Sequence, residues 1–115
     1  MRKSQHRSEA RADIRNLLKT SHRMFGPRAR RDYKALLDRA ITFLCADPQR
    51  TGVQRYDEVP NTNFYHLRHA RTRGGQPKQP RHIIVFTYDD ETLTILRVLH
   101  DAMDVAERTD DESDA

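Results

Sequence analysis

Residues 82–104 constrain the fold more than any other part of the chain, because two strand-like runs stand there on either side of a short turn. In the first run, 83–88, apolar side chains fall on both faces of an extended chain, a pattern typical of a central strand. The second run, 92–99, is rich in β-favouring residues and alternates less cleanly. Residues 89–91, two aspartates and a glutamate, separate the runs and favour a turn. The sequence therefore predicts a β-hairpin with a short loop.

Arg97 is the anomaly in the second run, because its strand neighbours are apolar. Leu93, Ile95 and Leu99 share its predicted face of the strand. A cation among apolar neighbours needs a partner to offset the cost of losing water. Arg97 is therefore either paired at the surface of the sheet or placed there for a ligand.

Two amphipathic helices precede this hairpin. The first begins at Ser8, a suitable N-cap, and ends at Gly26-Pro27, where proline is suited to opening the second helix. Their apolar stripes are Ala10, Ile14, Leu17, Leu18 and Met24 or Phe25 in the first, and Ala29, Tyr33, Leu36, Leu37, Ala40, Ile41 and Leu44 in the second. So short a connection predicts an antiparallel αα-hairpin whose combined stripe covers the strands.

A further strand and a basic loop lie between the helices and the hairpin. Residues 63–71 alternate as a strand, with Tyr65, Leu67 and His69 predicted on one face. The following residues, 72–80, include two glycines and two prolines and no apolar side chain, so we expect an exposed loop.

The remaining segments complete a single predicted domain over residues 1–115. Residues 1–7 form either a frayed terminus or a short edge strand, and residues 51–62 form a linker. Residues 100–108 suit a short C-terminal helix, and the acidic tail 109–115 is expected to be disordered. The predicted fold class is α+β, an N-terminal αα-hairpin packed on a small antiparallel sheet of three to four strands.

Composition limits the compartment and the chemistry. Hydrophobic residues make up 36% of the 115 residues and charged residues 33%, so a few concentrated segments must supply the core. Cys45 is the single cysteine, which excludes an internal disulfide and favours a small core residue in a reducing compartment. No apolar run approaches the roughly 20 residues that span a bilayer. We expect a cytoplasmic protein that does not enter a membrane.

Charge is polarised along the chain. Residues 1–39 carry 12 Lys and Arg against 4 Asp and Glu, whereas residues 82–115 carry 2 against 10. The basic residues are either the solvated faces of two helices or a surface for nucleic acid or an acidic protein. No helix-turn-helix, phosphate-binding glycine loop or aromatic stacking platform accompanies them.

The segment at 97–104 reads RVLHDAMD and follows a strand of the RHIIVFTYD type. Earlier comes an αα-hairpin with DI at 13–14, FG at 25–26, and Tyr33 followed by LLDRAITFLCADP. Over residues 8–108 these features resemble the ParE/RelE toxins of bacterial type II toxin–antitoxin modules, most closely the ParE branch. Two segments depart from the family pattern: the first strand is less apolar, and the Gly/Pro-rich loop is longer and more basic.

This resemblance implies a single toxin domain with two protein partners. It implies a toxin that inhibits a bacterial type II topoisomerase, DNA gyrase, and that is neutralised in a hetero-oligomer by a cognate ParD-like antitoxin. The residues expected to bind the target are Arg97, His100, Met103 and Asp104. The residues expected to bind the antitoxin are Leu17, Leu18, Tyr33, Leu37 and Arg68.

An enzyme is the alternative that the resemblance leaves open, namely a RelE-like ribosome-dependent mRNA endonuclease. Cutting RNA at the 2′-OH requires a general base, a general acid and a cation on the phosphate. Arg68 and Arg97 could supply the cation and His100 the acid or base, although His100 equally suits a structural role at a strand end. No Tyr or His follows Met103, which favours the topoisomerase inhibitor. A family member that binds only its antitoxin is a third possibility.

No cofactor or metal is expected. His66 and His69 are three positions apart, which on a strand directs their side chains to opposite faces, and no cluster of carboxylates completes a ligand set.

Overall fold

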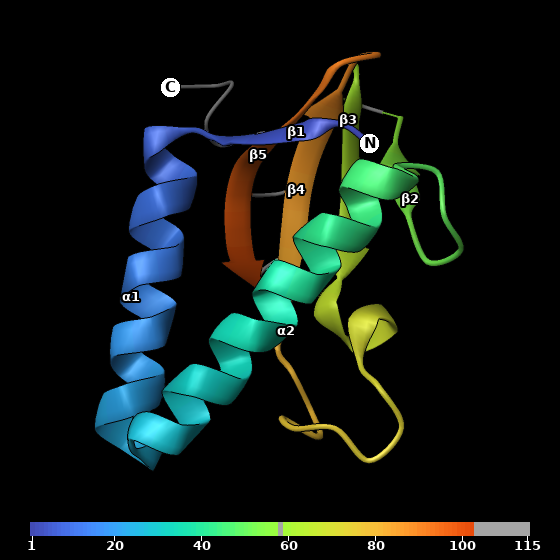
Figure 1. Ribbon diagram of the computed structural model, residues 1–115. Helices are drawn as coiled ribbons and strands as arrows, with labels where there is room; N and C mark the ends of the chain where they lie inside the picture. Colours follow the sequence, from blue (N-terminus) through green and yellow to red (C-terminus); the bar gives the residue numbers. More distant parts are fainter. Residues whose placement is uncertain (58, 103–115) are drawn as a thin grey trace.

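Two helices cover one face of a five-stranded sheet in the computed structural model, which describes residues 1–57 and 59–102 (Figure 1). The elements are β1 (Lys3–His6), α1 (Ser8–Phe25), α2 (Pro27–Ala46), β2 (Gln54–Tyr56), β3 (Thr62–His66), the 3₁₀ helix η1 (Leu67–Ala70), β4 (His82–Tyr88) and β5 (Thr92–His100). This arrangement confirms the predicted α+β class with an N-terminal αα-hairpin.

The strand order is β1-β5-β4-β3-β2, so the expected three to four strands are in fact five. The predicted hairpin is confirmed as β4–β5, and β4 is the central strand. In its turn, the Asp89 carboxylate accepts the backbone N–H groups of Glu91 and Thr92 at 2.9 and 2.8 Å. The two outer strands are polar edges. β1, which the sequence left open, pairs parallel with β5, and β2 forms within residues that were predicted to be only a linker.

A β-bulge in β5 corrects the predicted faces of that strand. Val85 pairs with Arg97 and Phe86 with Ile95, so Leu96 is one extra residue on β5. Beyond this residue the alternation is shifted by one position. Val98, rather than Leu99, joins the helix-covered cluster, and Leu99 packs on the opposite face of the sheet.

The predicted strand 63–71 is also shorter than expected. Extended backbone ends at His66, and residues 67–70 turn into η1. The imidazole of His66 caps this turn by accepting the backbone N–H of Arg68 at 3.0 Å. A side chain that offers the backbone a local acceptor competes with the strand ladder, which accounts for the early end.

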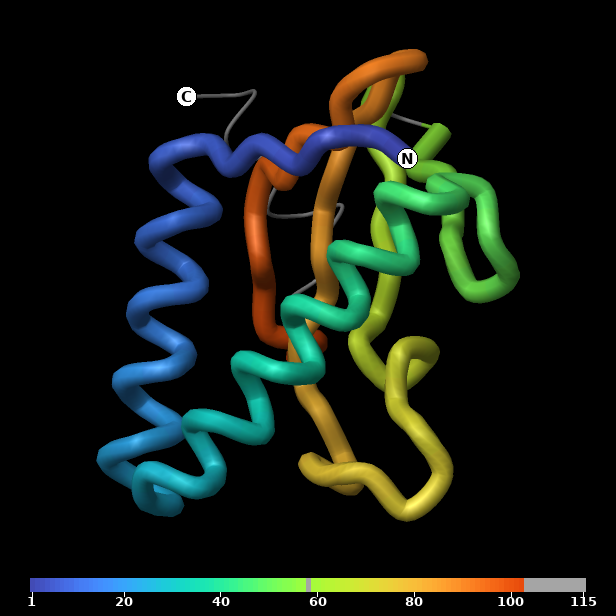
Figure 2. Tube along the Cα trace, viewed as in Figure 1, coloured from blue at the N-terminus to red at the C-terminus, as the bar shows by residue number. Residues whose placement is uncertain are grey.

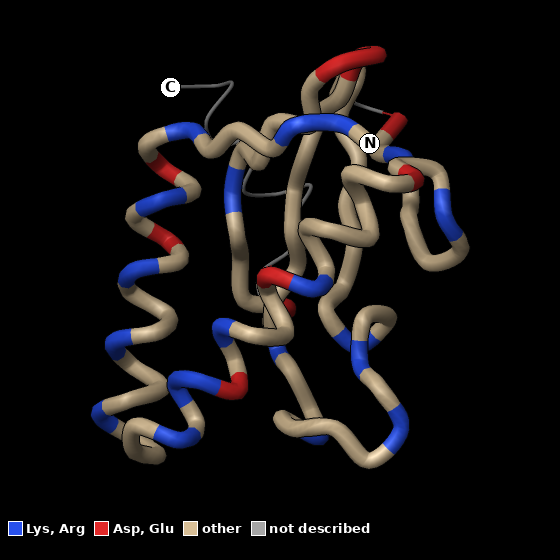
Figure 3. Tube along the Cα trace, viewed as in Figure 1, with Lys and Arg blue, Asp and Glu red and all other residues tan. Residues whose placement is uncertain are grey.

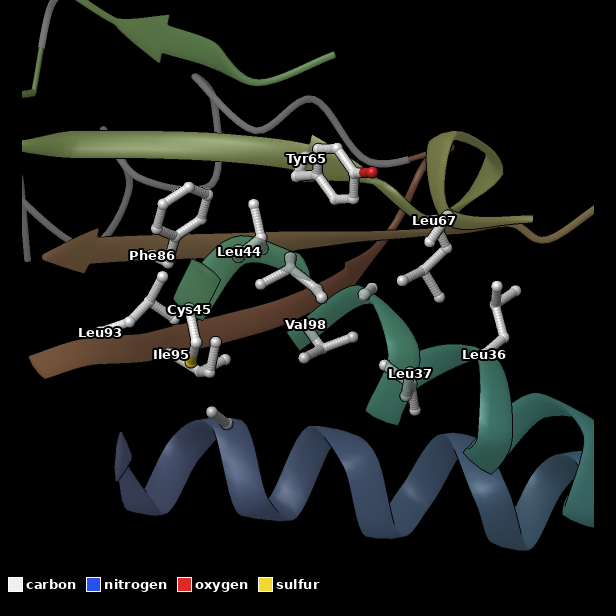
Figure 4. Packing of buried hydrophobic residues seen from close by; sticks show 14 of the residues in the cluster. Leu36, Leu37, Leu44, Cys45, Tyr65, Leu67, Phe86, Leu93, Ile95 and Val98 are labelled. Atoms are coloured by element: carbon white, nitrogen blue, oxygen red, sulfur yellow. The ribbon is translucent and has the colours of Figure 1, made fainter. Parts of the chain in front are cut away.

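The main core lies between the helices and the sheet (Figure 4). Its large, fully buried side chains are Tyr65, Phe86, Leu36, Leu44, Leu67, Ile84, Leu93 and Ile95. Cys45 is buried among them, which confirms its expected packing role. Ile83, Val85 and Leu99 form a second, smaller cluster on the other face, with Phe64 and Leu96 against it. β4 is therefore buried on both faces, as predicted.

The helices connect through a single residue, Gly26, whose φ of +93° lies in the region that favours glycine. The predicted apolar stripe of α1 is buried at Ala10, Leu17 and Leu18 but not at its end. Met24 and Phe25 are 63% and 75% exposed, which corrects their assignment to the core.

The expected C-terminal helix and acidic tail fall mostly on residues 103–115, outside the described residues. Asp101 and Ala102 form a turn after β5. Of the helices in the described part of the chain, none combines the length and apolar character that crossing a bilayer demands.

We expect Leu44→Ala to lower the free energy of unfolding by about 2 to 5 kcal/mol, because it leaves a cavity in the main core. Ile41→Ala should lower the free energy of unfolding by a smaller amount, because Ile41 is only half-buried beside that core. The exposed control Arg31→Ala should cost under about 0.5 kcal/mol. Urea unfolding of the three variants checks this ranking, and equal midpoints for Leu44→Ala and Arg31→Ala would contradict it.

Candidate functional site

An ion pair between α1 and β5 accounts for Arg97. The guanidinium donates from Nε to Asp13 Oδ2 at 2.8 Å and from Nη2 to Asp13 Oδ1 at 3.2 Å. The same carboxylate accepts the backbone N–H of Val98 at 2.9 Å. β1 pairs with β5 only as far as Ile95, so Asp13 satisfies a donor on the outer edge of β5 where the ladder has ended. The sequence offered two roles for Arg97, an ion pair at the sheet surface or a ligand contact. The structure shows the ion pair.

Asp101 lies at the centre of a polar cluster at the end of β5, where it binds His66 and Arg81. Its carboxylate accepts from His66 Nε2 at 2.9 Å and from Arg81 Nε at 2.8 Å, and its N–H donates to the Arg81 carbonyl at 2.7 Å. Burial opposes ionisation, but the hydrogen bonds from His66 and Arg81 outweigh it and lower the pKa of Asp101. The cluster holds β3, β4 and β5 together at this end.

Both ring nitrogens of His66 are engaged. Because Nδ1 accepts from the Arg68 N–H, the proton sits on Nε2 and is donated to Asp101. His66 is buried, and its imidazole has no nitrogen left for a substrate. Its role is to fix the turn into η1.

Tyr33 and His82 form a second hydrogen-bonded pair beside this cluster. The Tyr33 hydroxyl accepts the Arg81 N–H at 3.0 Å and lies within hydrogen-bonding distance of His82 Nδ1, at 2.6 Å. Burial raises the pKa of Tyr33 to about 12. Burial, reinforced by the neighbouring His100, lowers the pKa of His82 to about 4. At neutral pH both groups are uncharged.

His100 lies next to His82, with ring centroids 5.3 Å apart and nearly perpendicular planes. Its Nδ1 accepts the Ala102 N–H at 3.0 Å, so the proton of the neutral ring is on Nε2. The side chain is 41% exposed. His100 is thus hydrogen-bonded at the strand end, one of the two roles considered from the sequence, and its side chain is partly exposed.

A largely apolar cavity of about 520 Å³ opens beside these rings. It lies between the helical hairpin and the 72–80 loop, and its volume is within the range of ligand sites. Residues from α1, α2, the loop, β4 and β5 line it, including Leu17, Phe25, Tyr33, Pro77, His82 and His100.

The structure distributes the expected antitoxin-binding residues between core and surface. Leu17, Leu18 and Leu37 are buried and hold the helices on the sheet, although Leu17 also lines the cavity. Tyr33 is half-buried at the cavity wall, and Arg68 is exposed on η1. Tyr33 and Arg68 are therefore the members of this set best placed to meet a partner.

The expected target-binding residues are only partly described. Arg97 and His100 both line a groove against α1, while Met103 and Asp104 lie outside the described residues. Within the described ranges, no three His, Cys, Asp or Glu side chains are grouped so that they could hold a metal ion.

The sequence alone did not single out Asp13, Arg81, His82 or Asp101 as site residues. Asp101 follows His100 directly, and His82 opposes His100 in the β4–β5 pairing. A predicted register for the hairpin could have revealed the two facing histidines. Asp13 could not be matched to Arg97, because 84 residues separate them.

Two antiparallel helices on one face of a mixed five-stranded sheet, with β1 parallel to β5, define a RelE/ParE-like domain. The chromosomal ParDE toxin–antitoxin system from P. aeruginosa includes a chain that aligns with a TM-score of 0.64 at 16% identity, over 87% of this chain and 96% of that one. A chain of the E. coli DinJ-YafQ toxin–antitoxin complex aligns with a TM-score of 0.58 at 13% identity, over 88% and 93%. These likenesses concern the fold.

The family described as "ParE toxin of type II toxin-antitoxin system, parDE" matches residues 6–105. The chain belongs to this family, as the resemblance of its sequence implied. No curated protein matches the chain in a sequence comparison.

We expect Asp13→Ala to destabilise the protein by about 1 to 3 kcal/mol, because it leaves a partly buried guanidinium and the Val98 N–H without this acceptor. The exposed Lys34–Asp38 pair offers a matched control, and Asp38→Ala should cost under about 1 kcal/mol. Chemical denaturation of both variants measures the difference. Equal costs would mean that the Asp13 contact is no stronger than a surface ion pair.

Acid should destabilise the fold through His82. Its folded pKa of about 4 lies below the ordinary 6.5, so unfolding takes up a proton between these values. The stability that the neutral His82 side chain contributes is therefore present above about pH 6.5 and is lost as the pH falls toward 4. Comparing the wild type with His82→Gln in urea across this range should show a shallower pH dependence for the variant. The exposed control His22→Gln should match the wild type.

Proposed function

We propose that this toxin inhibits a bacterial type II topoisomerase, DNA gyrase, and that a cognate ParD-like antitoxin neutralises it. The observation that carries the proposal is the match to the ParE toxin family over nearly the whole chain. In this proposal His100 and the segment that follows it, including Met103 and Asp104, contact the target. Arg97 supports that surface by holding β5 to α1.

The contacts of the polar groups favour a binding surface over a nuclease. The RelE-like mRNA endonuclease would need a cation for the scissile phosphate, yet Arg97 is engaged by Asp13. The endonuclease would also need an acid and a base, yet both nitrogens of His66 are engaged in hydrogen bonds. His82 has a pKa lowered to about 4, so it is a weak base and is not protonated at neutral pH. His100 supplies a single partly exposed imidazole, whose Nδ1 already accepts the Ala102 N–H.

The antitoxin partner is supported by the toxin–antitoxin complexes among the structures of the same fold. The exposed Phe25 and the apolar cavity beside it suit an amphipathic segment of that partner. Tyr33 at the cavity wall and Arg68 on η1 are the residues that we assign to this contact.

His100→Gln should remain toxic, because a topoisomerase inhibitor turns nothing over and glutamine retains a polar group of similar reach. Truncation after Ala102 should abolish toxicity, since it removes Met103 and Asp104 while keeping every described helix and strand. Growth arrest in bacteria expressing each variant is the measurement, with soluble yield and circular dichroism as folding controls. A cut after Leu99 is unsuitable, because it would also delete Asp101.

Two assays on purified protein separate the proposed function from its alternative. The wild type should inhibit supercoiling by gyrase and leave mRNA intact on translating ribosomes in primer extension. A folded, non-toxic His100→Gln together with a toxic truncation would favour the endonuclease. A nuclease would lose about a hundredfold in rate on removal of such a group.

A further inference from the structure

One end of the molecule concentrates exposed cations from two segments distant in sequence (Figure 3). Residues 19–31, around the α1–α2 connection, contain five Lys and Arg and no Asp or Glu. Residues 71–81, the loop before β4, contain four Lys and Arg and no Asp or Glu. All nine side chains are exposed: Lys19, Arg23, Arg28, Arg30, Arg31, Arg71, Arg73, Lys78 and Arg81. We name this set the basic end.

The two segments are neighbours in space. Figures 1 and 2 place the helix connection and the loop at the same end of the molecule. The cavity beside His82 is lined by Phe25 and Ala29 from one segment and by Gln76 and Pro77 from the other. The acidic β4–β5 turn lies at the opposite end, beside basic residues of β1 (Figure 3).

Most of these cations have no counter-charge within the described part of the chain. Arg81 pairs with Asp101, and Arg71 donates to the Gly75 carbonyl. The other seven take part in no side-chain hydrogen bond or ion pair with any residue that the structure describes. Asp32, half-buried at the cavity wall, is the nearby acid and has no ion pair with them.

The balance of charged and apolar groups indicates the class of partner. Protein–protein interfaces are depleted of charge at their centres, whereas protein–DNA interfaces are polar and strongly positive. The basic end presents nine cations beside two exposed apolar side chains, Met24 and Phe25. One exposed aromatic ring is no platform for stacking successive bases, which disfavours a single strand. Phosphates on both strands of a duplex match cations spread over two segments.

We infer that the basic end binds the phosphate backbone of duplex DNA, without sequence preference. The contact uses the exposed cations of the helix connection and of residues 71–81 and does not require His100, which lines the cavity between these segments. Since a topoisomerase acts on duplex DNA, such a contact would place the toxin on the DNA that its target holds. This consequence rests on the proposed function, whereas DNA binding itself does not.

Fluorescence anisotropy of a short labelled DNA duplex with the purified full chain tests the inference. Between about 50 and 200 mM salt, affinity should fall steeply, because each phosphate contact contributes roughly 0.9 to the slope of log affinity against log salt. Replacing Arg28, Arg30 and Arg31 together by Gln should weaken binding by about tenfold or more and reduce that slope by about 2 to 3.

The matched control replaces Lys3, Arg7 and Arg11 by Gln, the same change of net charge on exposed residues around β1 and the start of α1. It should retain wild-type affinity within about twofold, while circular dichroism verifies both folds. Equal weakening by the two triple variants would overturn the inference, because net charge alone would then explain binding. Tighter binding to single-stranded RNA or to polyglutamate than to the duplex would overturn it as well. The assay contains no topoisomerase, so its failure leaves the proposed function standing.

Discussion

Burial of β4 on both faces is the constraint on which the rest of the structure depends. One face meets the helical hairpin through Ile84 and Phe86, and the other meets a smaller cluster through Ile83 and Val85. A strand buried on both faces needs a paired neighbour on each side to satisfy its backbone, and β3 and β5 provide them. The polar strands β1 and β2 are left to the edges, where unpaired backbone groups can meet water.

Asp13 accepts a backbone donor that has no strand partner at the outer edge of β5. The bulge at Leu96 shifts the alternation, and the β1 ladder stops at Ile95, so polar groups of β5 meet α1 instead of another strand. One carboxylate binds both the Arg97 guanidinium and the Val98 N–H. The arginine of the RVLH segment therefore fixes the helix to the strand that carries His100. Its conspicuous position in the sequence reflects packing as much as recognition.

Two neighbouring regions of the molecule have different chemistry. At the end of β5, neighbouring polar groups bind one another: Tyr33 with His82, and Asp101 with His66 and Arg81. Around the helix connection, arginines project into water without partners among the described residues. Internally satisfied groups make a rigid surface for a partner, whereas unpaired cations attract a polyanion over a distance.

The sequence by itself determined the helical hairpin, the β4–β5 hairpin and the central place of β4, because local periodicity and turn chemistry specify them. It also marked His100 and Arg97. Only the tertiary structure decided that residues 3–6 pair with β5, that His66 ends a strand by capping η1, and that Arg97 meets Asp13. A one-residue bulge and contacts between distant segments leave no periodic trace in a sequence. Their energies arise only when the elements pack together.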